Sequence, residues 1–138
     1  IYQTIKQCGI EDAFFVKDPD GYYSAEILPY NDITTYPLEK MSLVDPQNKS
    51  YVAVDDMFCV TNIIEKKVIS NLFNAGGYVF EDAEVFCRYF SSLKQYGRIY
   101  LSHLIYAMLL DKMVFRPILV SDYEDWGTRK LYNLKTSI

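Results

Sequence analysis

Apolar positions change their period several times along this chain, and the changes separate helices from strands. Helical spacing appears at 1–8, where Gly9 follows as a stop signal, and again at 81–95 and 100–112. A last short helix is predicted over 128–137. Shorter apolar runs bounded by turn residues predict strands. They lie at 12–18, in a hairpin over 49–67, at the end of 68–80 and at 113–122.

Strands that alternate with helices are typical of an α/β fold, so we expect a mixed open sheet flanked by helices. Pro117 lies inside the last predicted strand, and proline favours a sheet edge or a bulge. The length fits one domain, and no repeat or linker divides 1–138. The chain begins with Ile1, inside a helical pattern that has no start signal. We therefore expect a fragment whose N-terminal part is missing.

The composition narrows the class of partner. The formal net charge is −4 and the 14 Lys and Arg residues are scattered, which argues against nucleic acid. No apolar run approaches the ~20 residues that cross a membrane, so no membrane partner is expected. Cys8, Cys59 and Cys87 are widely spaced, which indicates free thiols in a reducing cytoplasm. The single histidine, His103, suits a packed or surface position more than a catalytic one. The many aromatic residues are compatible with a homo-oligomer.

Two acidic residues follow the first predicted strand in the stretch DPDG at 18–21. Ligands of open α/β sheets bind beyond the carboxyl ends of strands, and Mg²⁺ accepts as few as one or two protein carboxylates. Asp18 and Asp20 are therefore candidate metal ligands. The same four residues also form a favourable type I turn without any ligand.

A charged pair, Glu65 and Lys66, closes the second strand of the predicted hairpin. A carboxylate can accept hydrogen bonds from sugar hydroxyls, and an ammonium can pair with a phosphate. Gly76 and Gly77 come before the next predicted strand, where glycine lets a ligand approach the backbone. Each motif also has a simpler explanation: a solvated charge cluster and an ordinary glycine bend.

The stretch EDWGT at 124–128 joins the last predicted strand to the last predicted helix. Thr128 suits the N-cap of that helix, but capping does not account for Asp125 or Trp126. Asp20 and Asp125 come from distant segments, and they can share one metal ion if the fold brings them together.

In their order and spacing, these motifs resemble the later part of the sugar-1-phosphate nucleotidyltransferases, which make NDP-sugars from an NTP and a sugar phosphate. FFVKDPDG is similar to a family strand that ends in a metal-binding Asp. SYVAVDDMFCVTNIIEKKVISNLFNAGGYVF is similar to the family's sugar-phosphate segment, and EDWGT resembles its D-x-G-T segment with a second metal-binding Asp. The similarity covers nearly all of the chain from about residue 12 and is clearest in 50–80 and 114–128.

The resemblance implies a nucleotide-diphospho-sugar transferase (Rossmann-like) fold and a Mg²⁺ cofactor. Asp125 and Asp20 would hold the metal, with Asp18 as the alternative to Asp20. The implied partners are an NTP and a sugar phosphate, and the implied process is surface-polysaccharide biosynthesis in the cytoplasm.

The resemblance also implies how the sugar phosphate is bound. Glu65 would contact sugar hydroxyls, and the backbone of Gly76 would face the sugar. Lys66 would bind the phosphate and act as the catalytic cation, because positive charge offsets the charge that develops on the phosphates.

The chain departs from the family pattern at several points. The family's glycine-rich loop with Arg and Lys, which binds the NTP phosphates, does not occur in this sequence, and Lys67 stands where many members have Pro. The tail after Thr128 leaves no room for the β-helix that some members append. We therefore expect this fragment to be inactive by itself. Two other interpretations stay open: a non-catalytic, nucleotidyltransferase-like module that binds a sugar or nucleotide or mediates assembly, and a different glycosyltransferase-like enzyme that uses DPD as its metal motif.

Overall fold

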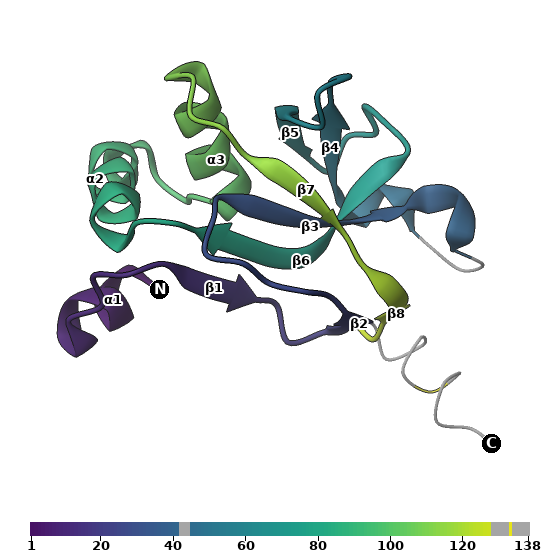
Figure 1. The fold of residues 1–138 in the computed structure, drawn as a ribbon, viewed down its shortest axis with the longest axis horizontal. Coiled ribbons are helices and arrows are strands. Elements are labelled where there is room, and N and C mark those ends of the chain that lie inside the picture. Colours follow the sequence, from purple (N-terminus) through teal and green to yellow (C-terminus); the bar gives the residue numbers. More distant parts are fainter. Residues whose placement is uncertain (42–44, 128–132, 134–138) are drawn as a thin grey trace.

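The computed structural model of the protein describes residues 1–41, 45–127 and 133, which form a sheet with helices packed against it (Figure 1). The helices are α1 Tyr2–Cys8, α2 Ala83–Leu93 and α3 Leu101–Leu110, with short 3-10 turns at Leu38–Lys40, Pro46–Asn48 and Lys94–Tyr96. The strands are β1 Phe14–Lys17, β2 Gly21–Ser24, β3 Asp32–Pro37, β4 Ser50–Val54, β5 Val60–Glu65, β6 Leu72–Phe80, β7 Arg116–Leu119 and β8 Ser121–Asp125. Within these described residues, no helix is both long enough and apolar enough to span a membrane.

The main sheet is built around β6. Its strand order is β5-β4-β6-β3-β7, and β1 also pairs with β6. β3 and β7 run parallel, whereas β6 is antiparallel to β1, β3 and β4, and β4 is antiparallel to β5. A second sheet consists of β2 and β8 alone. The mixed open sheet expected from the sequence is therefore confirmed.

One core joins the helices to the main sheet, and α2 and α3 lie on the same side of β3 and β6 in Figure 1. α2 begins where the sequence pattern places it, because the Asp82 side chain accepts a hydrogen bond of 2.9 Å from the backbone N–H of Val85. α3 begins beside His103, an exposed residue whose Nδ1 accepts from the backbone N–H of Tyr100 at 3.3 Å. The ring of Phe80 lies at the centre of the core, in contact with Phe14, Phe86 and Phe115.

The long strand β6 contains a bulge opposite Thr34. The register between β3 and β6 shifts here, so that three residues of β6, 75–77, face Thr34 alone. The Thr34 hydroxyl accepts a hydrogen bond from the Gly77 N–H at 2.7 Å and donates one to the Gly77 carbonyl at 3.1 Å. A threonine side chain thus replaces the missing backbone partner. Gly76 and Gly77 lie within a strand, and the prediction that they precede it was wrong.

The single strand predicted at 113–122 is divided in the structure. β7 forms the edge of the main sheet, as Pro117 indicated, and this pairing ends where the Val120 N–H donates to the carbonyl of Thr35 at 3.0 Å. The chain then turns away, with Asp122 at φ 56, and β8 pairs with β2. The stretch 113–122, predicted as one strand, therefore passes from the main sheet to the second sheet.

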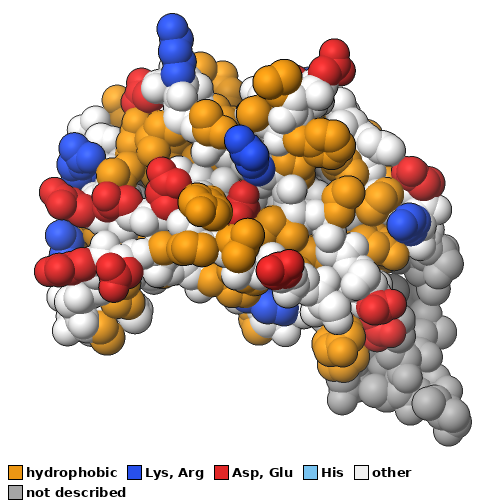
Figure 2. All heavy atoms as spheres, in the orientation of Figure 1, with side chains coloured by type: hydrophobic (Ala, Val, Ile, Leu, Met, Phe, Trp, Pro, Cys, Tyr) orange, Lys and Arg blue, Asp and Glu red, His pale blue; other side chains and the backbone are white. Residues whose placement is uncertain are grey.

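The end of the chain carries the remaining differences. Asp125 is the last residue of β8, rather than a residue that follows a strand. Thr128 and nearly all of the helix predicted over 128–137 lie outside the described residues. Acidic, basic and hydrophobic side chains are interspersed over the face in Figure 2, and Met57 and Tyr96 are among the most exposed large hydrophobic residues. The homo-oligomer stays a prediction.

Candidate functional site

A pocket of about 390 Å³ opens where the ends of β1 and β5 meet β6 and the start of α3. Four residues singled out from the sequence line it: Asp18, Asp20, Glu65 and Gly76. Three separate segments of the chain supply them. The pocket is therefore produced by the tertiary fold and not by a local turn.

The DPDG turn meets the β6 bulge at the base of this pocket. The Asp18 N–H donates to the carbonyl of Gly76 at 2.7 Å, which extends the pairing of β1 with β6. Gly76 has φ 89, and a Cβ at this position would lie 3.1 Å from the Asp18 carboxylate. Glycine is therefore required by both its conformation and the close approach of Asp18. The Gly76 N–H itself donates to Asn74 Oδ1 at 2.7 Å.

The carboxylate of Asp18 lies in a negatively charged neighbourhood. Partial burial and the nearby charge of Asp20 raise its pKa, and the ammonium of Lys17 opposes the shift. Burial and the charge of Asp20 thus disfavour the ionised carboxylate of Asp18. A cation in this pocket would lower the electrostatic cost of holding Asp18 and Asp20 together.

Glu65 is held in one position by two serines. The Ser50 hydroxyl donates to Glu65 Oε2 at 2.6 Å, and the Ser102 hydroxyl donates to the same oxygen at 3.0 Å. Ser50 begins β4 opposite Glu65 in the hairpin, and Ser102 lies in the first turn of α3. No group among the described residues donates to Oε1, so this oxygen can accept a hydrogen bond from a ligand.

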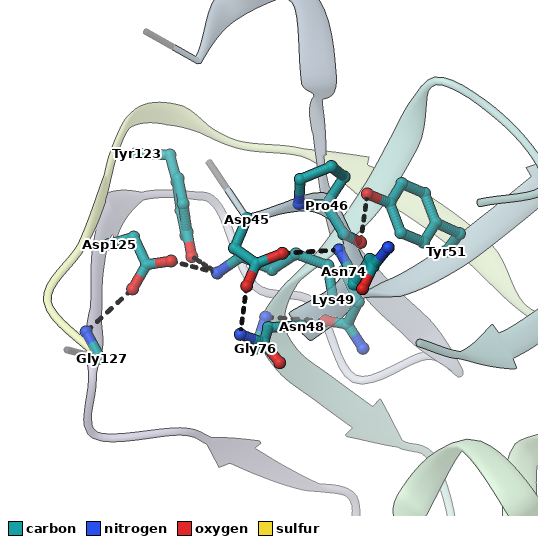
Figure 3. Close-up of polar contacts among 11 residues, drawn as sticks. Asp45, Pro46, Asn48, Lys49, Tyr51, Asn74, Gly76, Tyr123, Asp125 and Gly127 are labelled. Atoms are coloured by element: carbon teal, nitrogen blue, oxygen red, sulfur yellow. Dashed lines mark hydrogen bonds and ion pairs between the residues drawn. The ribbon is translucent and has the colours of Figure 1, made fainter. Parts of the chain in front are cut away.

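Lys49 is a site residue that the sequence interpretation missed. Its ammonium donates to Asp125 Oδ2 at 2.5 Å and to the Tyr123 hydroxyl at 3.0 Å (Figure 3). Its side chain is only 14% exposed, and the ammonium lies over the rings of Phe73 and Tyr123. Burial disfavours its charge, but the hydrogen bonds to Asp125 and Tyr123 outweigh burial and raise the pKa of Lys49. Lys49 is therefore a buried cation in the charged state.

The segment in front of Lys49 is held by local hydrogen bonds. Asp45 caps the short turn Pro46–Asn48 by accepting from the backbone N–H of Gln47 at 3.1 Å, and its other oxygen accepts from the Asn48 side chain at 2.8 Å. The Tyr51 hydroxyl donates to the Pro46 carbonyl at 2.8 Å (Figure 3). These contacts fix the point from which the Lys49 side chain reaches β8.

Asp20 and Asp125 approach each other beside Gly127. A Cβ built on Gly127 would lie 2.9 Å from Asp20 Oδ2 and 3.1 Å from Asp125 Oδ1, so both carboxylates border one small space. The backbone secures this arrangement, because the Trp126 N–H donates to the Asp20 carbonyl at 2.8 Å and Gly21 pairs with Asp125. The structure thus brings together the two acids proposed to share a metal.

Lys66 lies outside the pocket that contains Glu65 and Lys49. It is exposed, has a left-handed backbone with φ 56, and donates its N–H to the Lys49 carbonyl at 2.9 Å. It does not belong to the pocket lining. Lys49 is the one Lys or Arg among the described residues that line the pocket.

Comparison with known proteins finds similar folds among solved structures. No protein-family model and no curated protein matches the sequence. The nucleoside-diphosphate-sugar pyrophosphorylase from Vibrio cholerae RC9 matches 99% of the chain with a TM-score of 0.79 at 14% identity. The inositol-1-phosphate CTP transferase from T. maritima matches 97% with a TM-score of 0.69 at 17% identity. The CTP:phosphocholine cytidylyltransferase from Streptococcus pneumoniae matches 89% with a TM-score of 0.68 at 14% identity.

The chain has the nucleotidyltransferase fold. This confirms the fold expected from the sequence resemblance. The chain spans 61% of the Vibrio cholerae structure and 56% of each of the other two. The names of these proteins refer to different compounds: a nucleoside-diphosphate sugar, an inositol 1-phosphate and a phosphocholine. The fold alone therefore assigns neither an activity nor an acceptor to this chain.

The acids of this nucleotidyltransferase fold are compatible with Mg²⁺. Within residues 1–41, 45–127 and 133, no group of three or more His, Cys, Asp or Glu side chains is close enough to hold a metal by itself. Asp20 Oδ2 and Asp125 Oδ1 supply two hard oxygen donors that border the same space beside Gly127. Mg²⁺ commonly binds one or two carboxylates and completes its shell with water and substrate phosphates. The residues present fit that mode of binding.

Proposed function

We propose that this chain forms the acceptor-binding part of a nucleotidyltransferase that makes an NDP-sugar from an NTP and a sugar phosphate and releases pyrophosphate. The supporting observation is the pocket that gathers Asp18, Asp20 and Glu65 next to Asp125, within a fold shared with enzymes of this class. We assign the product to surface-polysaccharide biosynthesis in the cytoplasm, as the sequence resemblance implies.

The proposed reaction is a substitution at phosphorus. A phosphate oxygen of the sugar phosphate attacks the α-phosphorus of the NTP, the bond from this phosphorus to the β-phosphate oxygen breaks, and pyrophosphate leaves. A sugar phosphate is already ionised at neutral pH, so the protein needs no general base. Mg²⁺ bound to Asp125 and Asp20, with Asp18 as the alternative to Asp20, would neutralise charge on the phosphates.

The side chains of the pocket have distinct proposed roles toward the acceptor. Ser50 and Ser102 fix Glu65 by its Oε2, so that Oε1 is available to accept from a sugar hydroxyl. Gly76, which has no side chain, allows the sugar to approach the strand. Lys66 follows Glu65 directly, and its flexible stem can bring its ammonium to the acceptor phosphate.

The role of Glu65 is tested by binding. We would titrate the chain with a panel of sugar 1-phosphates in the presence of Mg²⁺ and measure Kd by calorimetry. Glu65→Gln keeps the shape of the side chain but removes a charged acceptor, which is worth about 1.5–3 kcal/mol, or roughly tenfold or more in Kd. Glu84→Gln on the exposed surface of α2 is the matched control and should bind like the unmodified chain.

Each result has a clear meaning. Equal affinity of the Glu65→Gln variant and the unmodified chain would contradict the role of Glu65. If no sugar phosphate binds at all, the non-catalytic assembly module becomes the better interpretation. Pyrophosphate release from an NTP is measured in parallel, and we expect none from this chain alone. Release above the background rate would show that the expectation of an inactive fragment is wrong.

A further inference from the structure

Lys49 places a positive charge inside a cluster of acids. Three carboxylates, those of Asp18, Asp20 and Glu65, line the same pocket as Lys49, and its ion-pair partner is Asp125. The partners lie 13–14% exposed, so this pair is shielded from solvent far more than an ordinary surface salt bridge. The cluster already contains one cation before any ligand arrives.

The ammonium occupies one side of a proposed metal ligand. Asp125 uses Oδ2 for Lys49, and its Oδ1 accepts from the Gly127 N–H at 2.8 Å and lies beside Asp20. A divalent cation that binds Asp125 would therefore lie close to the positive charge of Lys49. Like charges at such a distance repel, and the repulsion is stronger where water is excluded.

We propose that Lys49 is the resident counter-ion of this site: its ammonium neutralises Asp125 in the free protein and must give up part of that contact when a divalent cation binds. This inference rests on the proposed function. Its consequence is that the acids alone bind a divalent cation weakly. The negative charge of substrate phosphates would then make binding favourable, so cation and nucleotide would bind together.

The Lys49 side chain can make such a movement. Lysine has a flexible four-carbon stem and a compact ammonium. The ammonium lies 5.5 Å from the Phe73 ring centroid and 5.4 Å from that of Tyr123, and both rings can stabilise a nearby cation. An ammonium released from Asp125 would remain in the pocket with the phosphates as its new partners.

The test is a titration of the chain with Mn²⁺ alone, followed by electron paramagnetic resonance of the free ion. Lys49→Met keeps the apolar stem over the two rings and removes the charge. We expect it to bind Mn²⁺ about tenfold more tightly than the unmodified chain, from the loss of one repelling charge. Lys49→Arg, which keeps the charge, should bind like the unmodified chain. Adding Asp125→Asn to Lys49→Met should abolish the gain.

The outcomes distinguish failure of the counter-ion role of Lys49 from failure of the proposed function. Unchanged or weaker Mn²⁺ binding by Lys49→Met overturns the counter-ion role and leaves the proposed function intact. If neither protein binds Mn²⁺ at millimolar concentration, the metal assignment of the proposed function fails together with this inference.

A measurement on the unmodified chain guards against a variant that does not fold. The Lys49 methylene protons next to the ammonium lie near two aromatic rings, so their NMR signals should be shifted by ring currents. Addition of Mg²⁺ should change the positions of these signals while those of the exposed Lys66 stay in place. Signals of Lys49 that do not move at saturating Mg²⁺ would overturn the inference.

Discussion

Replacing Thr34 by valine removes the two hydrogen bonds that hold the β6 bulge and keeps the size of the side chain. Thr34 is 0% exposed, so water cannot take over the hydrogen bonds of Gly77. The Gly77 N–H loses a partner at 2.7 Å and its carbonyl loses one at 3.1 Å. An unsatisfied buried polar group costs about 1–3 kcal/mol, and the shorter bond dominates, so we expect a loss of about 2–4 kcal/mol in the free energy of unfolding.

The assay is equilibrium unfolding in urea, with the free energy taken from linear extrapolation at constant slope. Thr34→Ser is the matched control because it keeps the hydroxyl and removes one methyl group, which costs about 1 kcal/mol. Valine should therefore destabilise the protein more than serine does, although valine is the more hydrophobic residue. A valine variant as stable as the serine variant, or more stable, would refute the role of the hydroxyl in the bulge.

Two further predictions concern the start of the inner strand β3 and the aromatic core. Burial raises the pKa of Asp32; the charge of Arg116 opposes this shift and that of Glu81 adds to it. The fold therefore disfavours the ionised carboxylate, and the protein loses stability as the pH rises through the folded-state pKa of Asp32. Asp32→Asn should therefore raise the midpoint of thermal unfolding at pH 7 but not at pH values below the ordinary Asp pKa. The exposed control Asp56→Asn should leave the midpoint unchanged at both pH values. An equal gain for Asp32→Asn at both pH values would exclude ionisation as the cause. Phe80 is 1% exposed in the aromatic core, so Phe80→Ala should lower the free energy of unfolding by about 3–5 kcal/mol in urea; a loss below 1 kcal/mol would contradict its central packing.

The elements that depend on local patterns were predictable from the sequence. The helices α1, α2 and α3 and the β4–β5 hairpin lie where apolar spacing and turn residues indicated them. Asp18 and Asp20 could be singled out because a turn that follows an apolar strand has a known place at the edge of a sheet. Each of these conclusions needs only neighbours within about one element of the chain.

The parts that were missed depend on partners far away in sequence. Lys49 meets Tyr123 and Asp125, which lie 74 and 76 positions further along the chain. Nothing in the stretch around Lys49 distinguishes it from a solvated lysine. The β6 bulge has the same origin, because Thr34 and Gly77 are 43 positions apart. Two glycines in a row are the only local sign of it, and a bend in front of a strand accounts for them equally well.

The short β2–β8 ribbon has a consequence for how the site behaves over time. This ribbon pairs through few residues, contains a register shift, and belongs to a sheet separate from the six-stranded one, yet it carries Asp125. Two strands alone are marginal, so the ribbon should open in local unfolding events that leave the six-stranded sheet intact. The ion pair of Lys49 ties it to the segment that leads into β4, and the Tyr123 ring packs against Phe73 of β6. Each opening would part Asp125 from Asp20 and take the site apart, and any ligand that bridges the two acids would lengthen the intervals between openings.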